Sequence, residues 1–327
     1  GDQYMKELNI ERHISAHLTR DATLARSEGI TENDIEILHA VSFGNTDQLL
    51  YLDSLRTRPA YISRPLGSKK WAITRAFYKK PYEFTDRETL VFITAVITLD
   101  DWLEVLKCDI DRIIYYPNIW KWEGQRQLQP VKLHMLEPVG VRLGGMKEAP
   151  NLEIHDKVLS LLTAAEKYIH ITTVVVRSED YDIQVLRWLN MVLPPQERRA
   201  FSYAVRPVNP DIDLNLITVP AEELSAEGDS VASVNWLPSS NTEGCPYTRA
   251  LADRWKPGDP PPWDFINSVE SFSRAGDDDS LASSDGTLEK ELVKSNAGKK
   301  VILCSAAAIC ITAVMYFLIS GFSLKRH

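Results

Sequence analysis

Hydrophobic and polar positions along the first two thirds of the chain predict strands and helices in alternation. Short segments rich in β-branched and aromatic residues, each bounded by turn formers, predict strands. These segments are residues 35–43, 71–78, 90–98, 169–177, 200–205 and 214–219. The sequences VFITAVIT (91–98) and ITTVVV (171–176) are apolar on both faces, so we expect central strands there.

Segments with apolar residues at helical spacing predict helices between these strands. They are residues 100–106, 152–168 and 181–192, the first led by acidic residues and the last ended by two prolines. A separate amphipathic helix is expected over residues 1–34, where aliphatic side chains fall loosely in phase. The fold class predicted for residues 35–220 is α/β, a mixed sheet with flanking helices.

The C-terminal third changes in composition. Residues 221–298 are rich in Ser, Gly, Pro and acidic residues, which predicts a flexible linker. The segment Val301–Phe322 then runs for 22 residues without a charge. As a helix it would measure roughly 33 Å, against a hydrocarbon core of about 30 Å. We therefore predict that residues 299–327 form one transmembrane helix and a short basic tail, in contact with membrane lipid. A buried core helix is the alternative, although such helices usually keep a polar stripe.

Two further expectations concern this helix. The lysines shortly before it outnumber the basic residues after it, which places the soluble domain on the cytoplasmic side of the membrane. The small residues Ala306, Cys310 and Ala313 lie at i, i+4 and i+7, which predicts a packing face for a homodimer. The ordinary composition of membrane helices explains the same spacing, so both interpretations stay open.

Composition also removes several classes of function. The net charge of -8 argues against a nucleic-acid partner. The four cysteines form no CxxC motif, which disfavours a zinc knuckle or a redox pair and fits a reducing compartment. Neither GxxxxGK[ST] nor GxGxxG occurs in the sequence, so no phosphate loop is expected. We predict no metal and no cofactor.

Candidate catalytic groups are few. His13 and His17 stand at i, i+4, as a zinc pair on one helix face would, but we favour a solvated helix face because no third ligand is evident. We interpret Asp109 and Asp111 as helix caps. No nucleophile, base and orienting group come together, so catalytic residues are unknown and an enzyme is disfavoured. The alternative is a membrane-anchored hydrolase or nuclease with a dispersed active site.

Two sets of residues are candidates for partner binding. The linker segment 254–272 carries Trp255, Trp263 and Phe265, which form either a docking peptide or a strap that packs back on the domain. The strap is the interpretation that we favour. Arg198 and Arg199 follow two prolines, and we expect both on the surface as part of a partner-binding face.

Three segments of the domain resemble one known family. They are Leu38–Leu55, Trp71–Leu106 and Val174–Pro207, the last continued by Asn215–Pro220. In this order they are similar to the N-terminal domain of the bacterial GTPase-associated protein adaptors, which occur in conflict or defence gene clusters. The resemblance covers about 180 of 327 residues. The resemblance rests on three features: a strand that ends in an aromatic pair, a helix that begins with acidic residues, and a helix that ends in Leu-Pro-Pro and is followed by two arginines.

The sequence departs from this family at two positions. Gln48 stands where the family usually has a histidine after its opening turn, and Ile93–Thr94 replaces a Thr-His pair. The resemblance implies an adaptor that works beside a GTPase, without GTP hydrolysis of its own. We therefore predict a tail-anchored, cytoplasm-facing adaptor that places a protein partner, a GTPase encoded nearby, at the membrane.

Overall fold

The computed structural model describes most of the chain before residue 273. The described residues are 3–17, 21–42, 58–79, 89–138, 149–170, 173–177, 183–206, 214–219, 232–234 and 244–272. All of them lie in one compact unit, Gly1–Arg274. The predicted transmembrane helix, with Ala306, Cys310 and Ala313, lies outside the described residues. Within the described part, no helix is long and apolar enough to cross a membrane.

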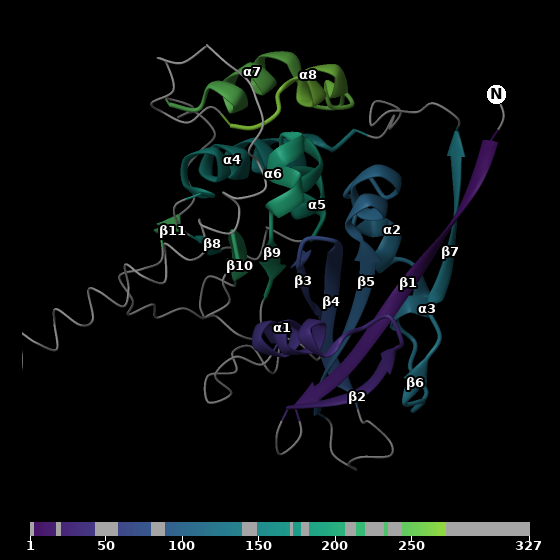
Figure 1. Ribbon diagram of the computed structural model, residues 1–327. Helices are drawn as coiled ribbons and strands as arrows, with labels where there is room; N and C mark the ends of the chain where they lie inside the picture. The colour runs from purple at the N-terminus through teal and green to yellow at the C-terminus, as the bar shows by residue number, and fades with distance from the viewer. Residues whose placement is uncertain are drawn as a thin grey trace, which may run out of the picture. The chain divides into compact units, whose positions relative to one another are not determined.

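An eleven-stranded mixed sheet forms the centre of this unit (Figure 1). Its strands are β1 (Gln3–His17), β2 (Asp21–Ser27), β3 (Ala60–Leu66), β4 (Lys70–Lys79), β5 (Thr89–Thr98), β6 (Gln127–Leu128), β7 (Val131–Pro138), β8 (Val174–Arg177), β9 (Tyr203–Val205), β10 (Leu216–Val219) and β11 (Ala232–Val234). The order is β11-β8-β10-β9-β3-β4-β5-β1-β2-β6, and β7 pairs with the first half of β1.

The pairing changes from parallel to antiparallel near the middle of the sheet, and β6 at the edge pairs parallel with β2. Strands β11, β8, β10 and β9 run parallel to one another, whereas β9 and β3 are antiparallel. The antiparallel pairing continues through β4, β5, β1 and β2. The mixed α/β fold class is therefore confirmed, and so is the central position of β5 between β4 and β1.

Helices cover both faces of the sheet. They are α1 (Glu32–Ser42), the π-helix η3 (Asp101–Val105), α2 (Asp111–Ile114), α3 (Pro117–Trp120), α4 (Leu152–Tyr168), α5 (Ile183–Val192), α6 (Pro195–Ala200), α7 (Pro246–Arg254) and α8 (Trp263–Ser268). Leu38 of α1 packs against Ala72 and Val96 on one face. Ile73 and Ile93 alternate with these positions and face the larger core, to which α2, α4 and α5 contribute.

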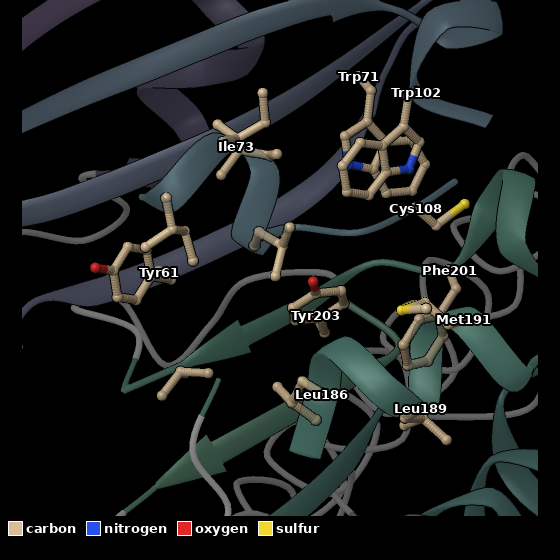
Figure 2. Close-up of a cluster of buried hydrophobic side chains, with 14 of the residues drawn as sticks. Tyr61, Trp71, Ile73, Trp102, Cys108, Leu186, Leu189, Met191, Phe201 and Tyr203 are labelled. Carbon is tan, nitrogen blue, oxygen red and sulfur yellow. The ribbon is translucent and has the colours of Figure 1, made fainter. Parts of the chain in front are cut away.

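Aromatic side chains fill the larger core (Figure 2). Trp71 of β4 and Trp102 of η3 stack with their ring centroids 5.4 Å apart. The Trp71 indole donates a hydrogen bond to Ser63 Oγ on β3 over 2.9 Å. Phe201 and Tyr203 extend the aromatic cluster toward the parallel strands, with centroids 5.7 Å apart. The first half of the fold is thus joined to the second by side-chain packing as well as by the β3–β9 pairing.

The predicted N-terminal amphipathic helix over residues 1–34 is wrong. The segment forms the strands β1 and β2, because its buried residues Leu8, Ile10, Ile14 and Ala16 follow a period of two. The strand expected over residues 35–43 is also wrong, since residues 35–42 belong to α1. Thr31 and Asp34 explain the start of that helix: the Thr31 amide donates to Asp34 Oδ2 over 2.9 Å, and the Asp34 amide donates to Thr31 Oγ1 over 3.2 Å. This reciprocal pair is a capping box.

Other expected elements are confirmed with small shifts. Strands β4 and β5 and helices α4 and α5 lie within a few residues of the expected bounds. The strand expected over 169–177 is shorter, because α4 continues to Tyr168 and β8 begins at Val174.

Candidate functional site

The aromatic segment after residue 243 folds back on the domain. We call Gly244–Phe272 the strap; it contains α7 and α8 and lies over α4, α5 and α6 (Figure 1). The Glu166 carboxylate of α4 accepts from the amides of Tyr247 and Thr248, both over 2.9 Å, and from the Thr248 hydroxyl over 2.7 Å. A carboxylate at the first turn of α7 stabilises both the free amides and the helix dipole. The favoured strap interpretation is confirmed.

Two of the predicted partner-binding aromatics lie inside. Trp255 is 1% exposed and Trp263 is 5% exposed. The Trp255 ring meets His155 edge-on with centroids 4.7 Å apart, and its indole donates to the Asp259 carbonyl over 2.9 Å. The expectation that these tryptophans are exposed recognition residues is wrong, because the apolar surface of α4 and α5 buries them.

The paired arginines separate in the structure. Arg198 is 2% exposed and donates through Nη2 to Asn267 Oδ1 of the strap over 3.2 Å, whereas Arg199 is exposed. Burial lowers the pKa of Arg198. The surface position is therefore wrong for Arg198 and confirmed for Arg199. Pro195 explains the difference: it ends the preceding helix, as expected, but also begins α6, whose turn directs successive side chains to different sides.

The end of the strap is fastened to α6 by a second set of contacts. The buried Glu197 carboxylate accepts from the Phe272 amide over 3.3 Å and lies 3.2 Å from His170 Nε2. The Gln196 amide donates to the Glu270 carbonyl over 3.0 Å. The fold thus brings together two residue sets that are more than fifty positions apart in the sequence.

Part of this junction stays at the surface. Phe265 is half-buried and stacks on Tyr247 with centroids 5.6 Å apart, and the Arg254 guanidinium lies 4.7 Å from the Phe265 ring centroid. We define the α6–strap surface by Arg199, Arg254 and Phe265. Guanidinium groups and an aromatic ring are side chains that commonly anchor protein interfaces.

A buried ion-pair cluster lies between η3 and α5. Arg187 holds Asp109 with two hydrogen bonds, of 2.7 and 2.9 Å, and also lies 3.3 Å from Asp111. Gln184 donates to both Asp111 oxygens over 2.9 and 3.0 Å. The expectation that Asp109 and Asp111 cap a helix is wrong, because Ile110 occupies the N-cap position of α2 without a side-chain hydrogen bond; Asp109 precedes it and accepts from the Asp111 amide over 3.1 Å. Sequence reasoning missed Arg187, since nothing in its local pattern distinguishes it from a surface residue of α5.

The residues before this cluster have an unusual backbone. Lys107 and Cys108 both adopt left-handed conformations, with φ of 57° and 59°. They follow the π-helix, and the Asn190 side-chain amide donates to the Cys108 carbonyl over 3.3 Å. The Cys108 thiol is buried, and burial raises its pKa to about 12. A thiol in this environment stays protonated at neutral pH and is a poor nucleophile.

The histidines form a different group from the expected one. His13 Nε2 lies 3.0 Å from Thr23 Oγ1, which in turn lies 3.2 Å from His39 Nε2 of α1. Burial, together with the positive fields of His39 and Arg26, lowers the pKa of His13 to about 3. The helical pair of His13 with His17 is wrong because both lie on the strand β1. Within the described residues, no group of three or more His, Cys, Asp and Glu side chains could hold a metal ion.

Comparison of the chain with protein-family models, with curated proteins and with solved structures gave no match in any of the three.

Proposed function

We propose that this chain is an adaptor that binds a protein partner through the α6–strap surface and holds it at a membrane. The observation that carries the proposal is the junction of α6 with the strap. Sequence reasoning selected the arginine pair and the aromatic segment separately as partner-binding candidates. The Arg198–Asn267 and Glu197–Phe272 hydrogen bonds join these two segments directly.

The α6–strap surface has the composition and the support that an interface needs. Arg199 is exposed, and Phe265 carries the Arg254 guanidinium over its ring. Trp263 and Arg198 of the same two segments are buried, and the Arg198 hydrogen bond to Asn267 joins the segments. A side chain that is already held in its bound position loses little conformational entropy when a partner binds, so such a surface gains affinity.

The proposed membrane attachment rests on the apolar segment Val301–Phe322. The compact unit ends at Arg274, so 26 residues, Ala275 to Lys300, separate it from this segment. A flexible chain of that length has a root-mean-square span of about 25–30 Å. Because the strap belongs to the compact unit, the stretch between this unit and the apolar segment has far fewer residues than the linker expected over 221–298. A partner bound to the domain would therefore be concentrated close to the bilayer.

The resemblance to the GTPase-associated adaptors supports a GTPase as the partner. It lies in the segments Leu38–Leu55, Trp71–Leu106 and Val174–Pro207, the last of which contains α6 and its two arginines. The α6–strap surface is therefore built in part from a segment that carries the resemblance. The chain itself would bind the GTPase and leave hydrolysis to it.

The test is a binding measurement with the full chain in detergent and the GTPase encoded beside it. We expect the double variant Arg199→Glu, Phe265→Ser to weaken the affinity at least tenfold, or about 1.4 kcal/mol. Lys69→Glu, a matched charge reversal on the exposed turn between β3 and β4, should bind normally. Equal affinity of the double variant and the native chain would contradict the proposed surface. GTP or phosphoester hydrolysis by the chain alone would favour the membrane-anchored hydrolase instead.

A further inference from the structure

Two arginines and a tyrosine meet where the sheet changes from parallel to antiparallel. Tyr61 of β3 pairs with Arg75 of β4 on one side and with Val205, the last residue of β9, on the other. Arg206 follows Val205 directly. This position lies at the carboxyl end of a parallel strand, at the point where the direction of the neighbouring strand reverses. Open α/β sheets commonly bind ligands outside the carboxyl ends of their parallel strands.

The first arginine carries a charge that the described residues do not balance. The Arg75 Nε atom is buried, and it forms no hydrogen bond within the part of the chain that the structure describes. None of the described ion pairs includes Arg75, and its guanidinium carbon lies 5.4 Å from the Phe77 ring centroid. A buried donor on a charged group is unfavourable unless an acceptor reaches it.

The second arginine is held toward the same place by its backbone. Arg206 has a φ of 51°, a left-handed conformation that is uncommon for a residue with a side chain. Its amide donates to the Thr218 carbonyl of β10 over 2.8 Å, and Nη2 donates to the Pro59 carbonyl over 3.2 Å. Pro59 immediately precedes β3, so the guanidinium lies at the start of the strand that carries Tyr61.

The charge around Tyr61 is positive on balance. Burial raises the pKa of Tyr61, and the positive fields of Arg75 and Arg206 oppose that rise. Asp111 is the carboxylate nearby, and it is already engaged by Gln184 and by the Arg187 guanidinium. Figure 2 shows Tyr61 at one end of the buried cluster, with its hydroxyl directed away from Trp71 and Trp102.

We propose that Tyr61, Arg75 and Arg206 form a binding site for a phosphate group, either inorganic phosphate or a phosphate monoester. Two guanidinium groups match the charge of a phosphate monoester, about -1.5 to -2 at neutral pH, better than that of a single carboxylate. Tyr61, on the strand between β4 and β9, adds a hydroxyl donor. Tyr115, which acts electrostatically on Tyr61, is 68% exposed. This site is independent of the α6–strap surface.

The proposal is tested by isothermal titration of the full chain in detergent with inorganic phosphate, phenyl phosphate and acetate. We expect saturable binding of at least one phosphate compound at one equivalent, and at least tenfold weaker binding of acetate. Tighter binding of phenyl phosphate than of inorganic phosphate would identify an ester as the ligand. Equal binding would identify the free anion. Acetate binding as tight as phosphate binding, or no binding of either phosphate compound, would overturn the site.

Variants then assign the binding to these residues. Arg75→Gln should weaken phosphate binding at least tenfold. Arg75→Lys keeps the positive charge but loses the planar guanidinium that can donate two parallel hydrogen bonds, so it should have a smaller effect. Arg64→Gln removes the same charge from the opposite face of β3 and should change the affinity less than twofold. Circular dichroism checks that each variant is folded. If Arg75→Gln does not fold, the titration of Arg75→Lys and of the native chain decides. Phosphate affinity that is unchanged in Arg75→Gln and in Arg75→Lys would overturn the proposal.

Discussion

The replacement of Trp255 by alanine tests whether the strap is part of the folded domain. Trp255 is the bulkiest side chain that the strap buries completely, and it is 1% exposed. Its ring contacts His155 at 4.7 Å and Trp188 at 6.5 Å between centroids. The variant would leave a cavity between α4, α5 and the strap, because the tryptophan side chain fills that space in the native structure.

The expected magnitude follows from the burial. Truncation of a buried Phe or Trp to Ala costs about 3–5 kcal/mol of folding free energy, in which the lost aromatic contacts are included. Loss of the indole hydrogen bond to Asp259 adds little, because Asp259 is exposed and its carbonyl can bind water. The total is a large part of the roughly 5–15 kcal/mol that stabilises an ordinary domain.

The measurement is urea unfolding of the full chain in detergent, followed by circular dichroism. Hydrogen exchange over residues 244–272 shows whether the strap detaches before the rest unfolds. Lys256→Ala, at an exposed neighbouring position, is the control and should change stability by less than about 0.5 kcal/mol. If Trp255→Ala unfolds at the urea midpoint of the native chain and keeps the exchange protection of the strap, the burial of Trp255 does not stabilise the strap on the domain.

Two further predictions concern buried polar groups. Asp109→Ala should cost about 3–5 kcal/mol in the same urea assay, because it leaves the Arg187 guanidinium buried without its main partner. A stability loss below about 1 kcal/mol would contradict this. His13 should make stability fall with acidification: its folded pKa of about 3 lies below the ordinary 6.5, so the unfolded state binds the extra proton between these values. Between pH 6.5 and 4.5 we expect a loss of about 2–3 kcal/mol that is absent in His13→Gln. An equal pH dependence of this variant and the native chain would show that His13 is not responsible.

The strands and helices that can be predicted from the sequence are those whose apolar residues follow a clear strand or helix pattern. Val91–Thr98 is apolar on both faces and forms the central strand β5, and α4 and α5 follow the helical spacing of their apolar residues. The N-terminal segment was misassigned because its aliphatic residues fit a loose helical period. The period of two in Leu8, Ile10, Ile14 and Ala16, interrupted at Arg12, is the better signal. The Thr31–Asp34 capping box was a second signal that would have identified α1.

The candidate sites depend on contacts that no local pattern contains. The sequence indicated that the aromatic segment could be a strap, but not that Glu166 caps its helix or that α6 meets its end. Arg198 and Arg199 look equivalent in sequence, and only the turn of α6 separates a buried side chain from an exposed one. The Tyr61–Arg75 pair arises from strand register, which depends on the whole sheet.

The adaptor account is tested most directly by the location of the partner in cells. We would measure the membrane-bound fraction of the neighbouring GTPase with the native chain, with the double variant Arg199→Glu, Phe265→Ser, and with a chain that ends at Arg274. We predict that the GTPase sediments with membranes only when the native chain is present. The double variant should stay in the membrane fraction without the GTPase, and the chain that ends at Arg274 should leave the GTPase in the soluble fraction. A GTPase distribution that is the same with all three chains would contradict the proposed function.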